Sequence, residues 1–301
     1  MVNAIPLDKT IENITVISRI SDMIGALHVQ SDQSIHFNGK LLDDIYPLVY
    51  TGMSKGHSLW HNNKVSKNMI ETKGTQHEVD SLNIGDTDVR AILLPKSRVD
   101  QYLQKKYGEK NVEKYRAHLI HTISEKDITS FLDIHARILK DKEVADQELE
   151  HLVLNILQNP KLVYTDPEAS YELVHKAIKV MQENLHSPLL INELAMTLEV
   201  NIRTLELAFK KHFNVSPKCY YKRFLLQQIE MKLRQRSPKE STVSDVLEEY
   251  QIYNLSQFGA SFKKYFDTTP SQTGVQCTQL NPFGWDETIF SQLLMHEESS
   301  A

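Results

Sequence analysis

The chain has 301 residues, which is enough for about two domains of ordinary size. Its hydrophobic content of 41% and charged content of 24% are typical of folded globular proteins, and its formal net charge is −5. No apolar stretch reaches the roughly 18 residues that a membrane span needs, so we expect no membrane segment.

The first ten residues lack the basic segment and apolar run of a signal peptide. The two cysteines, Cys219 and Cys277, provide no disulfide framework and fit a reducing compartment. We therefore expect a cytoplasmic protein.

Residues 1–100 consist mostly of short segments rich in Ile, Val and Tyr, separated by Gly, Asn, Asp and Ser. Such segments are typical of β-strands joined by turns. The clearest are residues 13–20, 34–38, 46–50 and 89–94. Several short strands at close spacing predict a small β-sandwich or barrel.

Helical periodicity begins near residue 97 and predicts helices over residues 98–107, 124–140 and 146–158. Ser124 can cap the second of these, and the last two each carry an apolar stripe. The stripes need a partner surface, which is either the chain's own sheet or a second copy; we favour a homodimer because symmetric dimers are common. The residues expected at that dimer surface are Ile128, Phe131, Leu132, Ile138, Leu149, Leu152, Val153 and Ile156.

The fold class that follows is α+β. A small β-sandwich or barrel-like domain with two or three helices is expected over residues 1–160, and a proline-containing linker over residues 161–169. An all-α domain is expected over residues 170–274 and a C-terminal extension over residues 275–301, in which the spacing of apolar residues predicts a short helix over residues 286–296.

One pattern in the last third of the chain occurs twice. The segment FKKHFNVSP at residues 209–217 recurs as FKKYFDTTP at residues 262–270, an offset of 53. Upstream, the same offset pairs Leu194 with Leu247. A fixed offset over this distance indicates one structural unit built twice, and each copy is too small to bury much core alone.

Each copy predicts two short helices joined by a tight turn. In the first copy, apolar spacing places one helix over residues 191–198, and Asn201 can cap a second helix over residues 202–213. The second copy repeats this plan, with Asn254 as the cap and its second helix over residues 255–266. Two short helices around a tight turn are the geometry of the DNA-binding helix-turn-helix.

The second helix of such a unit meets base edges with its N-terminal residues, and later basic residues suit phosphates. The residues expected to read bases are Arg203, Thr204, Glu206, Leu207, Leu255, Ser256, Gln257 and Ala260. The residues expected on the DNA backbone are Asn201, Lys210, Lys211, Asn254, Lys263 and Lys264. The second unit is poorer in charge, so we expect it to read fewer bases.

Residues 218–236 predict one continuous basic helix between the copies, about 28 Å long at 1.5 Å per residue. The surrounding residues 203–239 hold ten Lys or Arg and two acidic residues. This local positive field suggests a polyanion partner, although a solvated helix face gives the same pattern. A rod of this length can hold two reading helices about one turn of B-DNA apart.

The segment over residues 191–273 resembles the paired helix-turn-helix domain of the AraC/XylS family of bacterial transcription regulators. The residues that carry the resemblance are Leu194-Ala195, Leu205, Phe209-Lys210, Phe213, Val215-Ser216-Pro217, Tyr221, Ser256-Gln257-Phe258, Phe262-Lys263-Lys264-Tyr265-Phe266 and Thr269-Pro270-Ser271. The resemblance implies an activator that binds double-stranded DNA near a promoter and assists RNA polymerase. It also implies that the N-terminal half senses a small molecule and dimerises.

Other chemistry is weakly indicated. Tyr46, Tyr50 and Trp60 can line an effector cavity if the sheet curls into a barrel, although aromatic residues more often fill cores. Histidine pairs such as His57 and His61 arise by chance in a chain with 13 histidines, so we expect no metal site. The sequence holds no P-loop or other cofactor or catalytic motif, so we expect neither a cofactor nor an enzyme.

Two alternative interpretations stay open. One is an enzyme domain in the N-terminal half joined to a DNA-binding tail, as in DNA-repair methyl acceptors with a nucleophilic cysteine; both cysteines of this chain lie outside that half. The other is a regulator whose N-terminal half binds a protein partner and no metabolite.

Overall fold

The computed structural model of the chain describes residues 2–7, 15–21, 24–73, 78–161, 168–187, 189–236 and 241–273. The chain forms two compact units, one made mainly of residues 13–164 and the other mainly of residues 165–280. Within the described ranges, no helix is both long enough and apolar enough to cross a membrane. Most of the expected linker, and the whole extension after residue 274 with its helix, lie outside the described residues.

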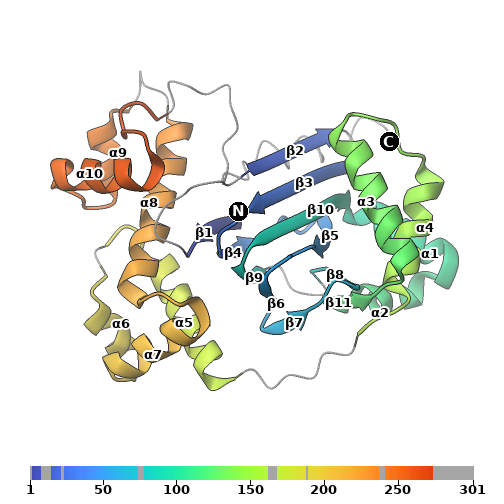
Figure 1. Cartoon of the computed structure of the whole chain (residues 1–301), viewed down its shortest axis with the longest axis horizontal. Coiled ribbons are helices and arrows are strands. Elements are labelled where there is room, and N and C mark those ends of the chain that lie inside the picture. Colours follow the sequence, from blue (N-terminus) through green and yellow to red (C-terminus); the bar gives the residue numbers. More distant parts are fainter. Residues whose placement is uncertain are drawn as a thin grey trace. The chain divides into compact units, whose positions relative to one another are not determined.

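The N-terminal unit contains two β-sheets (Figure 1). One has the strand order β1-β4-β9-β6-β7, formed by β1 (Val2–Pro6), β4 (Ile35–Lys40), β9 (Glu78–Gly85), β6 (Gly56–Trp60) and β7 (Asn63–Val65). The other has the order β11-β8-β5-β10-β3-β2, formed by β11 (Ile120–Thr122), β8 (Met69–Glu71), β5 (Ile45–Thr51), β10 (Thr87–Pro95), β3 (Ile24–Ser31) and β2 (Thr15–Ser21).

The six-stranded sheet is covered on both faces. Successive side chains of a strand point to opposite faces, and all of β5 is buried. Pro47 and Val49 line a space shared with residues of the other sheet, whereas Tyr46, Leu48 and Tyr50 pack among helices. The helices of this unit are α1 (Lys96–Tyr107), α2 (Val112–Arg116), α3 (Glu125–Leu139) and α4 (Asp146–Leu157), with a 3-10 turn at Glu109–Asn111.

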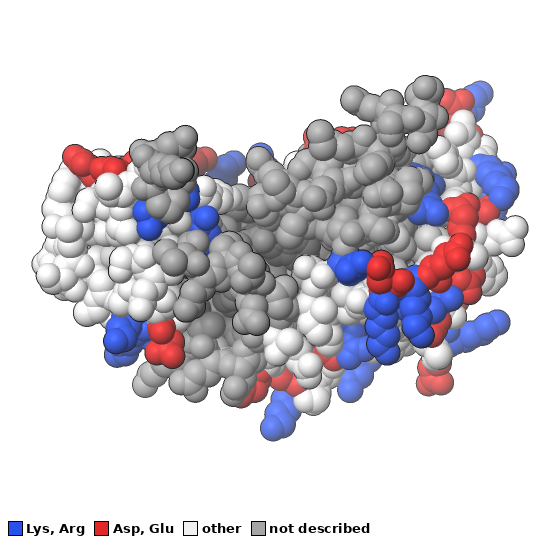
Figure 2. Space-filling view, turned by 90° about the horizontal axis from the view of Figure 1, so that it is seen from above, with Lys and Arg blue, Asp and Glu red and all other residues white. Residues whose placement is uncertain are grey.

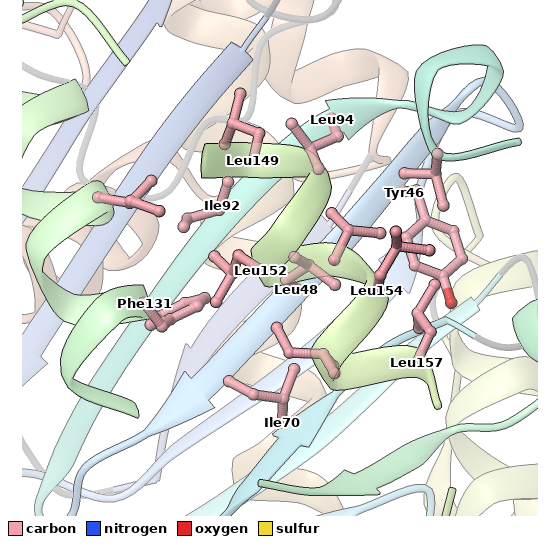
Figure 3. Packing of buried hydrophobic residues seen from close by; sticks show 14 of the residues in the cluster. Tyr46, Leu48, Ile70, Ile92, Leu94, Phe131, Leu149, Leu152, Leu154 and Leu157 are labelled. Atoms are coloured by element: carbon pink, nitrogen blue, oxygen red, sulfur yellow. The ribbon is translucent and has the colours of Figure 1, made fainter. Parts of the chain in front are cut away.

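The core between the six-stranded sheet and its helices contains the predicted dimer stripe (Figure 3). Phe131 is fully buried on α3, and the apolar residues of α4 belong to the same cluster as residues of strands β5 and β10. Of the eight residues expected at a dimer surface, Ile128 and Leu132 are partly buried against this cluster and the other six are buried inside it. The chain's own core therefore covers the six buried side chains, which do not present a face to a second copy.

The C-terminal unit is helical. Its helices are α5 (Ala169–Glu183), α6 (Ile191–Thr197), α7 (Ile202–Phe213), α8 (Pro217–Gln235), α9 (Val243–Glu249) and α10 (Leu255–Phe266). The α+β class, with a two-sheet N-terminal part and a helical C-terminal part, is confirmed.

Candidate nucleic-acid interface

The first helix-turn-helix consists of α6 and α7. Asn201 precedes α7 in extended conformation, and its side-chain oxygen accepts the backbone N–H of Thr204 at 2.8 Å. This bond satisfies one of the free N–H groups at the start of the helix. At the other end, Asn214 closes α7 in the left-handed conformation that asparagine tolerates. Asn201 and Asn214 thus define the start and the end of α7.

The second helix-turn-helix consists of α9 and α10. Thr242 caps α9 through the N–H of Asp245, and the hydrogen bonds to Thr242 hold the pKa of the Asp245 carboxyl below its usual range. Asn254 caps α10 by accepting the N–H of Gln257 at 3.1 Å. Asp267 ends α10 in the left-handed conformation, as Asn214 ends α7. The second helices of the two units, α7 and α10, therefore share their cap chemistry, whereas α6 begins after Leu190 without a side-chain cap.

The two copies differ by one residue in the turn. The expected pairing of Leu194 with Leu247 is wrong, because the N–H of Val200 bonds the carbonyl of Ala195 and the N–H of Ile252 bonds that of Leu247. The first helices therefore correspond at an offset of 52, so that Ala195 and Leu247 are equivalent. The second helices correspond at 53, so the second turn contains one additional residue, Tyr253.

Helix α8 joins the two helix-turn-helix units, because its side chains pack in the cores of both. Its Tyr220 stacks on Phe213 of the first unit, with ring centroids 5.2 Å apart. Its later residues Ile229 and Leu233 pack in one cluster with Phe262 and other residues of the second unit. Because both halves of α8 are packed, the helix fixes the spacing of the two units by packing as well as by its length.

The outer face of α7 carries the residues predicted to read bases. Arg203 and Glu206 are exposed there. The hydroxyl of Thr204 donates to Asn201 at 3.0 Å, which commits it to the cap. Leu207 is 57% exposed, and it lines, with Thr204, a groove of about 610 Å³ between α5 and this unit. Arg203 and Glu206 are therefore the side chains of α7 best placed for base contacts.

The outer face of α10 is exposed as predicted, but its chemistry is different. Leu255, Ser256, Gln257 and Ala260 are exposed, and no residue from Leu255 to Ser261 is charged. Lys263 and Lys264 follow, exposed in the same positions as Lys210 and Lys211 on α7.

Acidic neighbours reduce the positive field that the composition predicts. Lys211 contacts Glu168, Lys232 pairs with Glu249 at 3.2 Å, and Arg234 pairs with Glu230. Burial raises the pKa of Glu230, and the Arg234 charge opposes this rise. On the face drawn in Figure 2, Lys and Arg side chains are interspersed with Asp and Glu side chains.

Helix α8 is consequently less of a basic rod than its sequence suggests. Arg223 is 7% exposed, whereas Lys218 and Lys222 are exposed. Helix α5 packs against α7, where Ser170 bonds His212 at 2.9 Å. Burial, with a smaller contribution from Lys211, lowers the pKa of His212. His212 therefore adds little positive charge at neutral pH.

The predicted effector residues separate in the structure. Trp60 lines a cavity of about 40 Å³ between the two sheets, and its indole N–H donates to the carbonyl of Thr72 at 3.0 Å. Tyr46 and Tyr50 lie on the other face of the six-stranded sheet, in the core with the helices. Burial raises the pKa of both tyrosines. The cavity lining is apolar apart from Ser81, and comprises Leu27, Phe37, Leu41, Pro47, Val49, Trp60, Val79, Ser81, Val89, Ala91 and Leu93.

Sequence reasoning missed Glu71, which lies beside this cavity. Glu71 is fully buried on β8 and is paired with Val49, a lining residue. Thr51 donates to one of its oxygens at 3.1 Å, while the other has no hydrogen-bond partner among the described residues. Burial raises its pKa to about 8. No motif marks such a carboxyl, because the strand pairing that buries it joins residues far apart in the chain.

Comparison with known proteins agrees with the helical geometry. A family described as a helix-turn-helix domain matches residues 194–274. The probable thc operon regulatory protein of Rhodococcus erythropolis is 20% identical over 110 residues, which are 36% of this chain and 33% of that protein. The HTH-type transcriptional regulator GbdR of Pseudomonas aeruginosa is 27% identical over 97 residues, which are 32% of this chain and 26% of that protein.

The chain thus spans about a third or less of the length of these curated relatives. Among solved structures, ToxT from Vibrio cholerae is 12% identical, with a TM-score of 0.33 over 89% of this chain and 100% of that chain. The matched segment contains α7, α8, α9 and α10 together with most of α6. The resemblance recognised in the sequence is confirmed for this segment: residues 194–274 are a helix-turn-helix domain of the AraC type.

Proposed function

We propose that the chain is a transcription regulator that binds double-stranded DNA in a sequence-specific manner through α7 and α10. The observation that carries this proposal is the same on both helices: an exposed N-terminal face is followed by an exposed lysine pair. Lysines contact phosphates and fix the register of a protein on the duplex, while the residues before them can meet base edges. The shared packing of α8 supports a fixed distance between the two contacts.

The N-terminal unit is proposed to bind a small-molecule effector between its two sheets. The apolar cavity beside Trp60 supports this role, as does the buried Glu71 with an oxygen that has no hydrogen-bond partner among the described residues. The ligand expected there has an apolar body, because the cavity lining is apolar apart from Ser81. Activation of transcription, contact with RNA polymerase and a homodimer follow from the family resemblance and are part of the same proposal. The dimer surface must then lie outside the α3 and α4 stripe.

Salt dependence of duplex binding tests the DNA-binding role. The full chain is titrated with a fluorescent random duplex and with the best duplex selected from a random pool, at several salt concentrations. We expect affinity to fall steeply with salt, because each phosphate contact releases counterions. The double variant Lys210→Ala, Lys263→Ala should reduce the slope of log affinity against log salt by about 2. Absence of binding at low salt, or a salt-independent affinity, would refute the proposal.

A thermal-shift screen tests the effector role. A small apolar metabolite that binds the folded state raises the melting temperature, and the rise grows with the logarithm of its concentration relative to its Kd. Trp60→Ala removes the largest side chain of the cavity lining and should abolish the rise for that compound. If a protein partner raises the melting temperature and no metabolite does, the N-terminal unit binds proteins.

A further inference from the structure

The two recognition helices are equivalent in backbone and different in the residues that face outward. At the offset of 53, Lys263 and Lys264 of α10 match Lys210 and Lys211 of α7. In contrast, Ser256 replaces Arg203 and Gly259 replaces Glu206. Residues suited to phosphates are therefore the same in both units, and residues suited to base edges differ. This division indicates that the two helices read different bases.

We propose that α7 reads a G·C-containing element and that α10 reads an A·T element by contacts that use no charge. This inference rests on the proposed DNA-binding function and assigns its specificity. Arginine suits the acceptor edge of guanine, and glutamate suits the amino group of cytosine. Arg203 and Glu206 are both exposed on α7. The first helix therefore presents a donor and an acceptor that match the two bases of a G·C pair.

Helix α10 presents the groups that suit an A·T pair. A glutamine amide can bond the N6 and N7 edge of adenine, and an alanine methyl can contact the C5-methyl group of thymine. Gln257 and Ala260 are exposed three residues apart, on one side of the helix. The Asn254 amide donates to the side-chain oxygen of Gln257 at 3.3 Å, and this bond does not use the N–H donors of the glutamine amide. Thr204, at the equivalent position of α7, instead donates its single hydroxyl proton to Asn201.

Gly259 allows α10 to approach the duplex closely. A Cβ atom built on Gly259 would meet nothing within 4 Å, so packing inside the protein does not require glycine there. Glycine within a helix costs about 1 kcal/mol relative to alanine. Gly259 thus destabilises the helix although no internal contact requires it. Close approach of a partner to the helix surface would explain the glycine. The floor of the major groove is that partner in our proposal.

The additional turn residue extends this surface. Tyr253 is 75% exposed and lies next to the cap of α10, where the first unit has no equivalent residue. Tyrosine hydroxyls are among the groups that bond phosphates. Leu255, 49% exposed, matches Ile202 of α7, which is 39% exposed, so both helices begin with an exposed apolar side chain. Tyr253 is therefore the group that the second unit adds where it lacks charges.

Substitution of deoxyuridine for thymine tests the proposal, because it removes only the methyl group. The full chain first selects its preferred duplexes from a random pool. Each thymine of the best duplex is then replaced in turn, and the affinity of each duplex is measured. We expect a loss of about fourfold for one methyl, confined to one half of the site, since a buried methyl contributes about 0.8 kcal/mol. In Ala260→Gly the loss should disappear.

A second variant covers the case in which two adjacent glycines weaken α10. Gly259→Ala should raise the melting temperature, since alanine favours the helix, and should lower the affinity for the selected duplex several-fold. Glu206→Ala, at the equivalent position of α7, is the matched control: it should change the preference in the G·C element and retain the deoxyuridine effect. Duplex binding that is insensitive to every deoxyuridine, or a Gly259→Ala variant with unchanged affinity, overturns this inference alone. Absence of any duplex binding overturns the proposed function and the inference with it.

Discussion

The C-terminal unit exposes the polar side chains that matter for its proposed function, whereas the N-terminal unit buries them. In the C-terminal unit, the residues that matter for recognition are exposed on α7 and α10 above an apolar core. In the N-terminal unit, polar groups such as Glu71 and the hydrogen-bonded pair of His36 and Asp80 are buried among the strands. A surface of exposed side chains suits a large partner that approaches from outside. Buried polar groups suit a small ligand or serve the fold itself.

This difference has a consequence for substitutions. An exposed recognition residue can be changed with little effect on stability, so its role appears in binding alone. A buried group cannot be changed in this way, because its loss leaves a cavity or an unpaired partner.

The largest effect is expected at Phe131, which lies in the predicted dimer stripe. Phe131 is 0% exposed in the core of the N-terminal unit, so Phe131→Ala should lower the free energy of unfolding by about 3–5 kcal/mol. Chemical denaturation measures this, with Thr129→Ala on the exposed side of the same helix as the control. If Phe131→Ala instead left stability unchanged and shifted a monomer–dimer equilibrium in sedimentation, the stripe would be an interface and not a core.

Glu71 should make the stability of the N-terminal unit depend on pH. Burial raises its pKa from 4.5 to about 8, so the folded state binds a proton more tightly than the unfolded state. The resulting stabilisation is complete below about pH 4.5 and is lost as pH rises through about 8. Glu71→Gln should remove this pH dependence. Its effect on the free energy of unfolding should be more favourable at pH 8 than at pH 5 by on the order of 3 kcal/mol.

Denaturation curves at several pH values measure the effect of Glu71→Gln, and Glu78→Gln, on an exposed residue of β9, is the control. If the free energy of unfolding of Glu71→Gln and of the unsubstituted protein changed with pH in parallel, Glu71 would ionise as an exposed carboxyl does. The N-terminal unit would then not differ from the C-terminal unit in this respect.

The sequence predicted the C-terminal unit closely because its signals are local. Helix periodicity and caps such as Asn201 and Asn254 depend on residues three or four positions apart, and both caps bond as expected. The one-residue insertion at Tyr253 was missed, because the leucines of the first helices align equally well at a false offset. The residues of one helical turn alone do not show whether Leu194 or Ala195 is equivalent to Leu247.

The N-terminal unit was predicted in class but not in its site. Strands at residues 13–20, 34–38, 46–50 and 89–94 correspond to β2, β4, β5 and β10. Strand β5 is buried on both faces, so its pattern does not reveal which side chains face the cavity. The pairing of Val49 with Glu71 joins two strands with no short-range signal between them. The sequence pattern therefore favours Tyr46 and Tyr50 over the residues that the sheets bring to the cavity.

A smaller effect is expected at Arg203, and it should appear in binding only. Arg203→Ala should reduce the preference for one base pair by about 1–3 kcal/mol in competition between duplexes. Because Arg203 is exposed, the free energy of unfolding should change by less than about 0.5 kcal/mol. Lys210→Ala is the control, since loss of a phosphate contact weakens binding to all sequences alike. An unchanged base preference in Arg203→Ala would mean that α7 reads DNA through other residues.

The smallest effect is expected at the caps, where stability and binding can be separated in one residue. Asn201→Ala should cost about 1 kcal/mol of stability, because the N–H of Thr204 loses its acceptor. Asn201→Asp keeps an acceptor there and favours the positive helix end, so it should retain stability. The same aspartate places a negative charge where the phosphates are proposed to lie, so it should weaken duplex binding while the melting temperature holds. Equal losses of stability in both variants, or an aspartate variant with native affinity, would place Asn201 in the fold and away from the DNA.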